Sequence, residues 1–436
     1  MVLIYSHITS SRLEYIAHFI FKELMGTEFQ ISIDSEDYKN YEGVKINYSD
    51  LELDGFHIQN TALLFEDDIK QQSIDCFEVN GYKAFFKITG SGFPFDIFAA
   101  AFYLISRYEE YLPHTKDMYG RYAHENSIAF KNNFLHLPLI NIWVDEFAEI
   151  LRKKYPSFIT HPPAFKIIPT YDIDIAYSYQ HKGFVRNMGG IFRSVFAGKF
   201  SAAKERVRVL NNRSADPFDS YQQLDQLHQQ YQLQPIYFFL VPEKNGLYDK
   251  NILPHKNAMW SLVKNHAKKY AIGLHPSWQS SDDLSLLKKE KEQLEAMAER
   301  PVTVSRQHYI RFSLPEGYHR LITNGITDDH SMGYGSINGF RASVASSFTW
   351  YDLQKETPTM LRIHPFCYME ANSFYEQRLT ASQALNEMME YYNLCKKFNG
   401  IYISIWHNHF LGTDPLYKGM GEVYEQFLAA IDRSLV

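Results

Sequence analysis

The 436-residue sequence predicts an α/β protein in which a small α+β domain precedes a β/α barrel. Three observations lead to this prediction. From Lys166 onward, continuous apolar runs alternate with helical stretches, which indicates a parallel sheet or a β/α barrel. The roughly 270 residues that remain there are about the number that one such barrel needs. Before Lys166 the apolar segments are short and alternating, as is typical of a separate, smaller domain.

The first 155 residues contain several short strand-like segments and two helical stretches. The segments are IYSHI, FQISI, KINYS, TALLF and YKAFFKI, and the helical stretches are 96–112 and 139–155. Three prolines then fall within residues 156–165, which indicates a linker. We therefore expect an N-terminal domain of unknown function at 1–155, followed by the linker and by the barrel at 166–436.

Six apolar runs indicate the strands of the barrel. In chain order they are KIIPTYDID, PIYFFLV, YAIGLHP, VTVSRQHY, TPTMLRIHP and IYISIWHNH. Helical stretches such as DPFDSYQQLDQLHQQY and SDDLSLLKKEKEQLEAMAER separate several of them. Continuous apolar runs of this kind are typical of parallel strands that helices cover on both faces.

Composition narrows the functional classes. Lys and Arg number 44 against 50 Asp and Glu, so the chain lacks the overall basic excess of a nucleic-acid or anionic-membrane binder. Three widely spaced cysteines without a CxxC pair fit a reducing compartment. The N-terminus has no signal-peptide pattern, and no stretch approaches about 18 uncharged apolar residues. We therefore expect a cytoplasmic enzyme without a membrane span.

Ionisable side chains collect at the carboxyl ends of five of the six runs. They are Asp172 and Asp174, His275, Arg306 with His308, His364, and His407 with His409. Because the carboxyl ends of the strands form the catalytic face of α/β barrels, we expect these residues to meet in one pocket. The alternative is scattered polarity, since every strand must exit into water.

The segment Asp172-Ile173-Asp174 carries the clearest chemistry. Its two carboxylates point to the same side of a strand, because side chains in a strand repeat every two residues. One carboxylate could bind a cation while the other serves as a base. A turn capped by aspartate, a salt bridge at Arg306 and a satisfied buried histidine at His308 are the structural alternatives.

Taken in order, the runs in 166–436 resemble the polysaccharide deacetylase (NodB-homology) superfamily, which removes N- or O-acetyl groups from sugars with a distorted β/α barrel. TYDID (170–174) is similar to its Thr-Phe-Asp-Asp motif or the Asp-x-Asp variant, and GLHPS (273–277) to the end of its His-x-x-x-His-Pro motif. SRQHY, around Arg306, and IWH (405–407) are similar to two later motifs. The segments RQHYIRF, GFRASVASSF and SRYEEY make the chain most similar to a divergent branch with an uncharacterised N-terminal domain, found in bacterial surface-polysaccharide gene neighbourhoods.

The resemblance implies a role for each of these segments. It implies that Asp172 is the general base and that Asp174 and His275 hold a divalent metal, zinc before nickel, cobalt or iron. Arg306 would orient the base, and His407 would protonate the leaving group. The implied activity is metal-dependent removal of an acetyl group from a saccharide substrate, in surface-polysaccharide metabolism.

One position departs from the superfamily pattern. Its first metal histidine would fall four residues before His275, where this sequence has Ala271. Two side chains do not complete the shell of a divalent ion, and the sequence does not rank the further candidates. These candidates are His308, His364, His407 and His409.

Two other functions therefore stay open. The first is a catalytically silent, deacetylase-like protein that binds saccharide or serves as a scaffold, and it is motivated by Ala271. The second is a glycoside hydrolase that uses two carboxylates on one face, to which Asp328 and Asp329 could contribute.

Aromatic residues are unusually frequent, with 31 Tyr, 32 Phe and 5 Trp. Most of them are expected to fill cores, but those beside the candidate segments could line a sugar pocket. These are Tyr171, Trp278, Tyr309, Tyr334 and Trp406. In the N-terminal domain, residues 107–110 (RYEE) are expected to form a solvated helix end, with a contact to the barrel as the alternative.

Overall fold

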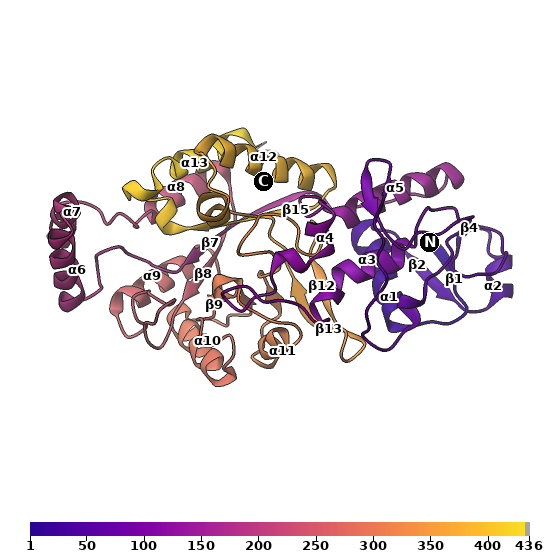
Figure 1. Cartoon of the computed structure of the whole chain (residues 1–436), viewed down its shortest axis with the longest axis horizontal. Helices are drawn as coiled ribbons and strands as arrows, with labels where there is room; N and C mark the ends of the chain where they lie inside the picture. The colour runs from indigo at the N-terminus through magenta and orange to yellow at the C-terminus, as the bar shows by residue number, and fades with distance from the viewer. Residues whose placement is uncertain (432–436) are drawn as a thin grey trace.

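Two sheets organise the chain, as Figure 1 shows for the computed structural model, which describes residues 1–431. A four-stranded sheet lies in the N-terminal part, and a nine-stranded sheet lies in the C-terminal part. Helices pack around both sheets (Figure 1). The mixed α/β class and the separate N-terminal domain that the sequence predicts are confirmed.

The N-terminal sheet has the order β2-β1-β3-β4, and its strands pair in parallel. The bounds are β1 Val2–Tyr5, β2 Phe29–Ser32, β3 Val44–Asn47 and β4 Phe56–His57, and a hairpin follows with β5 Phe77–Val79 and β6 Tyr82–Ala84. The helices are α1 Ser11–Ala17, α2 Ser35–Asn40, α3 Ile97–Ile105, α4 Ile128–Lys131 and α5 Leu139–Lys154. The prediction of a strand at TALLF is wrong: Ala62–Phe65 forms a 3-10 helix, which buries the adjacent Leu63 and Leu64.

The C-terminal sheet has the order β12-β13-β11-β10-β9-β8-β7-β15-β14. Its strands are parallel except for the antiparallel pair β12–β13, and the edge strands β12 and β14 do not pair with each other. The sheet is therefore an open, curled version of the expected barrel. The bounds are β7 Lys166–Ile173, β8 Ile236–Leu240, β9 Ala271–His275, β10 Val304–Ser305, β11 Asp328–Asp329, β12 Phe348–Asp352, β13 Thr357–Ile363, β14 Tyr368–Met369 and β15 Ile401–His407.

Helices connect most of these strands. They are α6 Phe184–Phe196, α7 Phe200–Leu210, α8 Tyr221–Tyr231, α9 Asn257–Ala267, α10 Leu284–Ala298, α11 Glu316–Thr323, α12 Ala381–Lys397 and α13 Met420–Ala430. Local sequence sets their ends: the Asp283 side chain accepts two backbone N–H groups at the start of α10, and Thr380 with Gln383 forms a capping box at α12.

The strand register brings the carboxyl ends together. His407 on β15 lies opposite Asp172 on β7, and His275 on β9 lies opposite Leu240 on β8. Gly273 makes the packing below this edge possible, because a Cβ there would lie 2.5 Å from the ring of Phe238. A side chain at position 273 would therefore displace that ring.

Buried charges join the N-terminal domain to the barrel. The Arg341 guanidinium donates to both carboxylate oxygens of Glu110, at 2.8 and 2.6 Å, and Arg107 donates to Glu110 and to the carbonyl oxygen of Arg341. Arg107, Glu110 and Arg341 are almost completely buried. The expectation of a solvated helix end at 107–110 is wrong, because these charges pair across the interface and are satisfied there.

Candidate functional site

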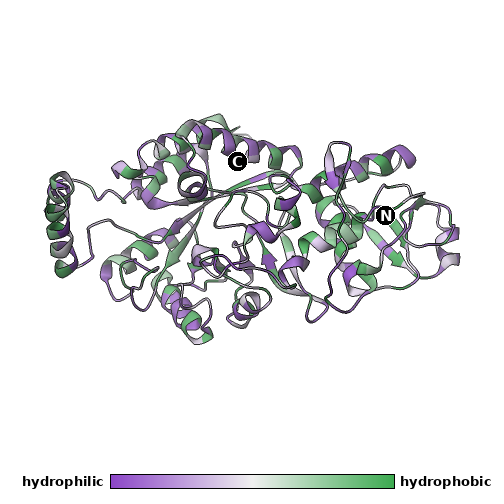
Figure 2. Ribbon diagram, in the orientation of Figure 1, coloured by the Kyte–Doolittle hydropathy of each residue, from purple (hydrophilic) through white to green (hydrophobic). Residues whose placement is uncertain are grey.

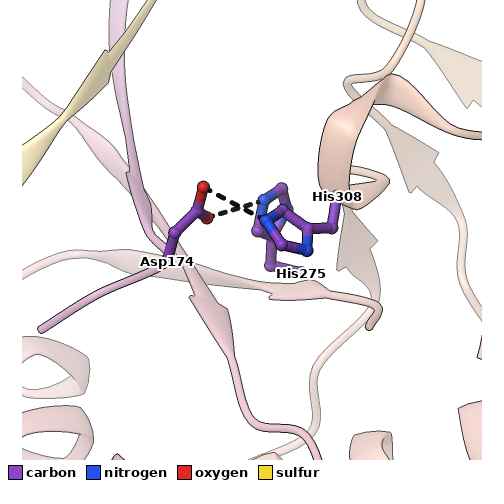
Figure 3. A group of neighbouring side chains, drawn as sticks. All are labelled: Asp174, His275 and His308. Carbon is purple, nitrogen blue, oxygen red and sulfur yellow. Dashed lines mark ion pairs between the residues drawn. The ribbon is translucent and has the colours of Figure 1, made fainter. Parts of the chain in front are cut away.

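Three side chains from different strand ends converge above the C-terminal sheet (Figure 3). Asp174 directly follows β7, His275 ends β9, and His308 stands three residues beyond β10. One ligand atom from each lies within 4.8 Å of the others. Nε2 of His275 lies 3.0 Å from Oδ1 of Asp174, and Nε2 of His308 lies 3.2 Å from Oδ2. Parallel strands with aligned carboxyl ends produce this convergence.

Hydrogen bonds at the back of each ring set the orientation of the two histidines. Nδ1 of His275 lies 2.6 Å from the carbonyl oxygen of Arg306, and Nδ1 of His308 lies 2.9 Å from Oδ1 of Asp249. Both partners are acceptors, so each Nδ1 donates the proton. In the neutral rings the Nε2 lone pairs then point toward Asp174, which is the arrangement that metal-binding histidines use.

The trio of Asp174, His275 and His308 contains groups whose pKa values are strongly shifted. Burial raises the pKa of the Asp174 carboxyl, but the charges of His308 and His275 outweigh burial and lower it well below its usual range. Burial lowers the pKa of His308, but Asp174 and Asp249 outweigh that effect and raise it to about 9. Oδ1 of Asp174 is buried and, although Nε2 of His275 lies 3.0 Å away, it accepts no well-aligned hydrogen bond from residues 1–431. A carboxylate and two imidazoles of this geometry therefore fit a divalent ion, which would replace the proton that His308 holds.

Asp172 lies beside the trio. Its Oδ1 accepts from Nη1 of Arg306 at 2.8 Å, and its Oδ2 lies 3.8 Å from Nε2 of His275. The same Arg306 nitrogen donates to Oγ1 of Thr170 at 2.7 Å, and the guanidinium lies 4.3 Å from the centre of the Phe238 ring. Arg306 is fully buried. Its contact fixes Oδ1 of Asp172, while Oδ2 faces the trio.

His407 approaches the trio from β15. Its Nε2 lies 3.4 Å from Oδ2 of Asp174, while its Nδ1 and backbone N both lie 2.7 Å from Oε1 of the buried Glu370. Burial lowers the pKa of His407, but Glu370 and Asp174 outweigh burial and raise it well above its usual value. Glu370 and Asp174 therefore favour the protonated form of His407.

Other predicted residues do not join this group. His364, beyond the end of β13, pairs through Nε2 with Asp328 at 2.8 Å and through Nδ1 with Ser347 at 2.7 Å. His409 packs its ring against Phe218 and Tyr417, and burial lowers its pKa to about 3.

Position 271 lies too far from Asp174 and His275 for any side chain there to join them. Ala271 begins β9 and His275 ends it. Four residues of extended strand span about 13 Å, so a histidine at 271 would lie at the opposite end of the strand from the trio. His308, three residues beyond the neighbouring strand β10, lies close enough to Asp174 and His275 to be the third ligand.

Two residues of the site were missed from sequence. Glu370 follows β14, which has only two residues, and Asp249 lies in the loop after β8. Neither segment has a hydrophobic period that marks a strand end. An acidic residue just after the short apolar run FCYM was the one available signal for Glu370.

An aromatic wall stands next to the trio, formed by Tyr119, Tyr248, Trp278 and Tyr309. The Tyr309 ring lies 4.6 Å from the His308 ring, and Tyr248 stacks on Trp278 at 3.8 Å between ring centres. Tyr119 comes from the N-terminal domain, and its ring lies 5.3 Å from that of Tyr309.

The five aromatic residues proposed from sequence separate into two groups. Trp278 and Tyr309 belong to the wall and keep exposed surface. Tyr171, Tyr334 and Trp406 are buried in the core. The Tyr171 ring stacks on Tyr237 and the Trp406 ring packs on Tyr424, while Tyr334 contacts Arg107 and Arg341.

Comparisons with known proteins place these observations in context. Residues 2–156 match the model of a family described as a family of unknown function (DUF7033), which coincides with the N-terminal domain. No curated protein matches the chain.

Several solved structures match part of the chain at low identity. A protein assigned as a polysaccharide deacetylase from Mycobacterium smegmatis is 13% identical with a TM-score of 0.39, and the match covers 62% of this chain and 86% of that one. The polysaccharide deacetylase from Bacillus cereus is 9% identical with a TM-score of 0.29, covering 61% and 87%. A mutant of a CE4 family pseudoenzyme is 11% identical with a TM-score of 0.28, covering 61% and 64%.

Proposed function

We propose that the chain is a metal-dependent hydrolase that removes an acetyl group from a saccharide. The observation that supports this most strongly is the convergence of Asp174, His275 and His308 from three strand ends, next to a separately held carboxylate, Asp172. Three protein ligands leave positions for water and substrate, as catalytic metal sites require. A divalent ion bound there would supply Lewis acidity toward the acetyl carbonyl and toward water.

Asp172 is suited to be the general base. Arg306 holds its Oδ1, while its Oδ2 stays on the side of His275. Oδ2 accepts a proton from the attacking water while the oxygen of that water forms a bond to the acetyl carbon. The buried guanidinium keeps the carboxylate oriented throughout this step.

His407 is suited to be the general acid. Glu370 fixes its ring and, with Asp174, favours the protonated form, which leaves Nε2 as the donor on the side of the trio. Nε2 gives its proton to the amine or alkoxide of the sugar as the bond to the acetyl carbon breaks. Acetate and the free sugar group are then the products.

The direct test combines metal analysis with a product assay. Protein purified without chelators should contain about one equivalent of a divalent metal per chain. We expect this metal to be zinc, with nickel, cobalt and iron as the alternatives. It should release acetate from a panel of N- and O-acetylated oligosaccharides, and the release should stop after chelation and return on adding metal. Absence of stoichiometric metal, together with saccharide binding but no acetate release, would support a silent binding or scaffold protein instead.

The aromatic wall is proposed to bind the sugar ring. Tyr309→Ala and Tyr119→Ala should each raise KM about tenfold and leave kcat within about threefold, because stacking contacts bind substrate and transition state alike. Steady-state kinetics on the best acetylated substrate measures both constants. Trp260→Ala, which removes an aromatic side chain of similar exposure on α9, serves as the control. An unchanged KM in both wall variants would contradict this assignment.

A further inference from the structure

Helices α6 and α7 form a hairpin that stands apart from both sheets, at the left end of Figure 1. The two helices pack against each other, and the hairpin is inserted directly after β7. Its base is held firmly: the Asp216 carboxylate accepts the backbone N–H groups of Ser178, Tyr179 and Gln180 at 2.7–2.9 Å. The hairpin therefore leaves the sheet at the end that carries the trio, in a set orientation.

Large apolar side chains of the hairpin face solvent. Phe184 is 79% exposed, Val185 84%, Phe192 57%, Phe196 88% and Phe200 65%. Val185, Phe192 and Phe196 are seven and four residues apart and lie on one face of α6. Figure 2 shows apolar residues along both helices of this isolated element. Contiguous exposed apolar surface of this kind marks an interaction site.

The hairpin is also strongly basic within an acidic protein. Residues 182–213 contain eight Lys and Arg but one acidic residue, Glu205, whereas the rest of the chain has 36 basic and 49 acidic residues. Glu205 already accepts the Tyr179 hydroxyl at 2.9 Å. Arg186 and Arg193 directly follow Val185 and Phe192, so they form a stripe about 100° around the helix from the apolar face.

We propose that this hairpin docks the protein on an anionic lipid bilayer. An apolar face flanked by Lys and Arg is the pattern of helices that lie in the membrane interface, where the rings enter the acyl boundary and the cations meet lipid phosphates. A second copy of the chain is a poor occupant, because two hairpins with seven net positive charges each would repel one another. Within the described residues, no helix is long and apolar enough to cross the bilayer.

Vesicle co-sedimentation of the full-length protein tests this. The protein should bind vesicles of equal parts phosphatidylcholine and phosphatidylglycerol at least about tenfold more tightly than pure phosphatidylcholine vesicles, and added salt should weaken the binding. Phe196→Ser/Phe200→Ser and Arg193→Glu/Lys199→Glu should each reduce binding to the anionic vesicles at least about tenfold. Met360→Ser, at a residue 86% exposed on β13, is the matched control and should bind like the native chain.

Three results would overturn the assignment. The first is equal, weak sedimentation of the native protein with both kinds of vesicle. The second is loss of binding in the charge variant alone, which would indicate general attraction to polyanions without insertion. The third is concentration-dependent dimerisation in analytical ultracentrifugation that Phe196→Ser/Phe200→Ser abolishes, with no vesicle binding. Circular dichroism confirms that the variants, all altered at exposed positions, remain folded.

Discussion

Replacing His308 with alanine is expected to remove the metal and abolish acetate release. His308 supplies one of the three converging ligand atoms, and its loss leaves only Asp174 and His275. Because two side chains do not hold a divalent ion in a fixed geometry, metal affinity should fall at least about 100-fold. Chelator competition with the purified variant measures the affinity, and elemental analysis after dialysis measures the residual occupancy.

The matched control is His364→Ala. His364 also follows a strand of the same sheet, but it pairs with Asp328 and Ser347 and not with the trio. This variant should keep its metal and its turnover. Full metal occupancy in His308→Ala, or loss of metal in His364→Ala with His308→Ala unaffected, would show that the ligands were assigned wrongly.

Asp172→Asn should separate catalysis from metal binding. The amide has the shape of the carboxylate and its oxygen can still accept from Arg306, so the surrounding contacts are preserved. It does not accept a proton from water, and kcat should fall about 1000-fold while metal content stays at the native level. Steady-state kinetics and elemental analysis of the same preparation give the two readouts.

Asp328→Asn is the control for this change, because Asp328 is a carboxylate of the same sheet, at the start of β11, whose partner is His364. Its turnover should stay within about threefold of the native enzyme. If Asp172→Asn also turns over within threefold, the general base lies elsewhere. If it loses the metal, Asp172 is a ligand and not the base.

The placement of ionisable residues at strand ends was the most informative pattern in the sequence. It grouped eight residues, of which the structure brings six together: Asp172, Asp174, His275, Arg306, His308 and His407. The other two, His364 and His409, lie apart from them. The reason is geometric: parallel strands present their carboxyl ends at one edge, so strand order need not be known to expect convergence. The roles of these residues remain predictions that the variants above test.

The sequence does not identify the third candidate ligand, His308. His308 and His364 each follow an apolar run, and nothing in the local pattern distinguishes them. The strand order does, because β10 neighbours β9 whereas β13 lies two strands further along the sheet. The same limit applies to Glu370 and Asp249, which act on the histidines from segments without a strand-length hydrophobic period.

The sequence by itself therefore determined the fold class, the N-terminal domain and the edge of the sheet where the chemistry collects, because hydrophobic periodicity and strand-end polarity are local properties of the chain. Only the tertiary structure decided which histidine faces Asp174, which aromatic residues reach solvent beside it, and that Tyr119 of the N-terminal domain joins the wall. These are contacts between segments distant in sequence, and their outcome depends on strand order and on the packing of whole elements, which no local pattern encodes.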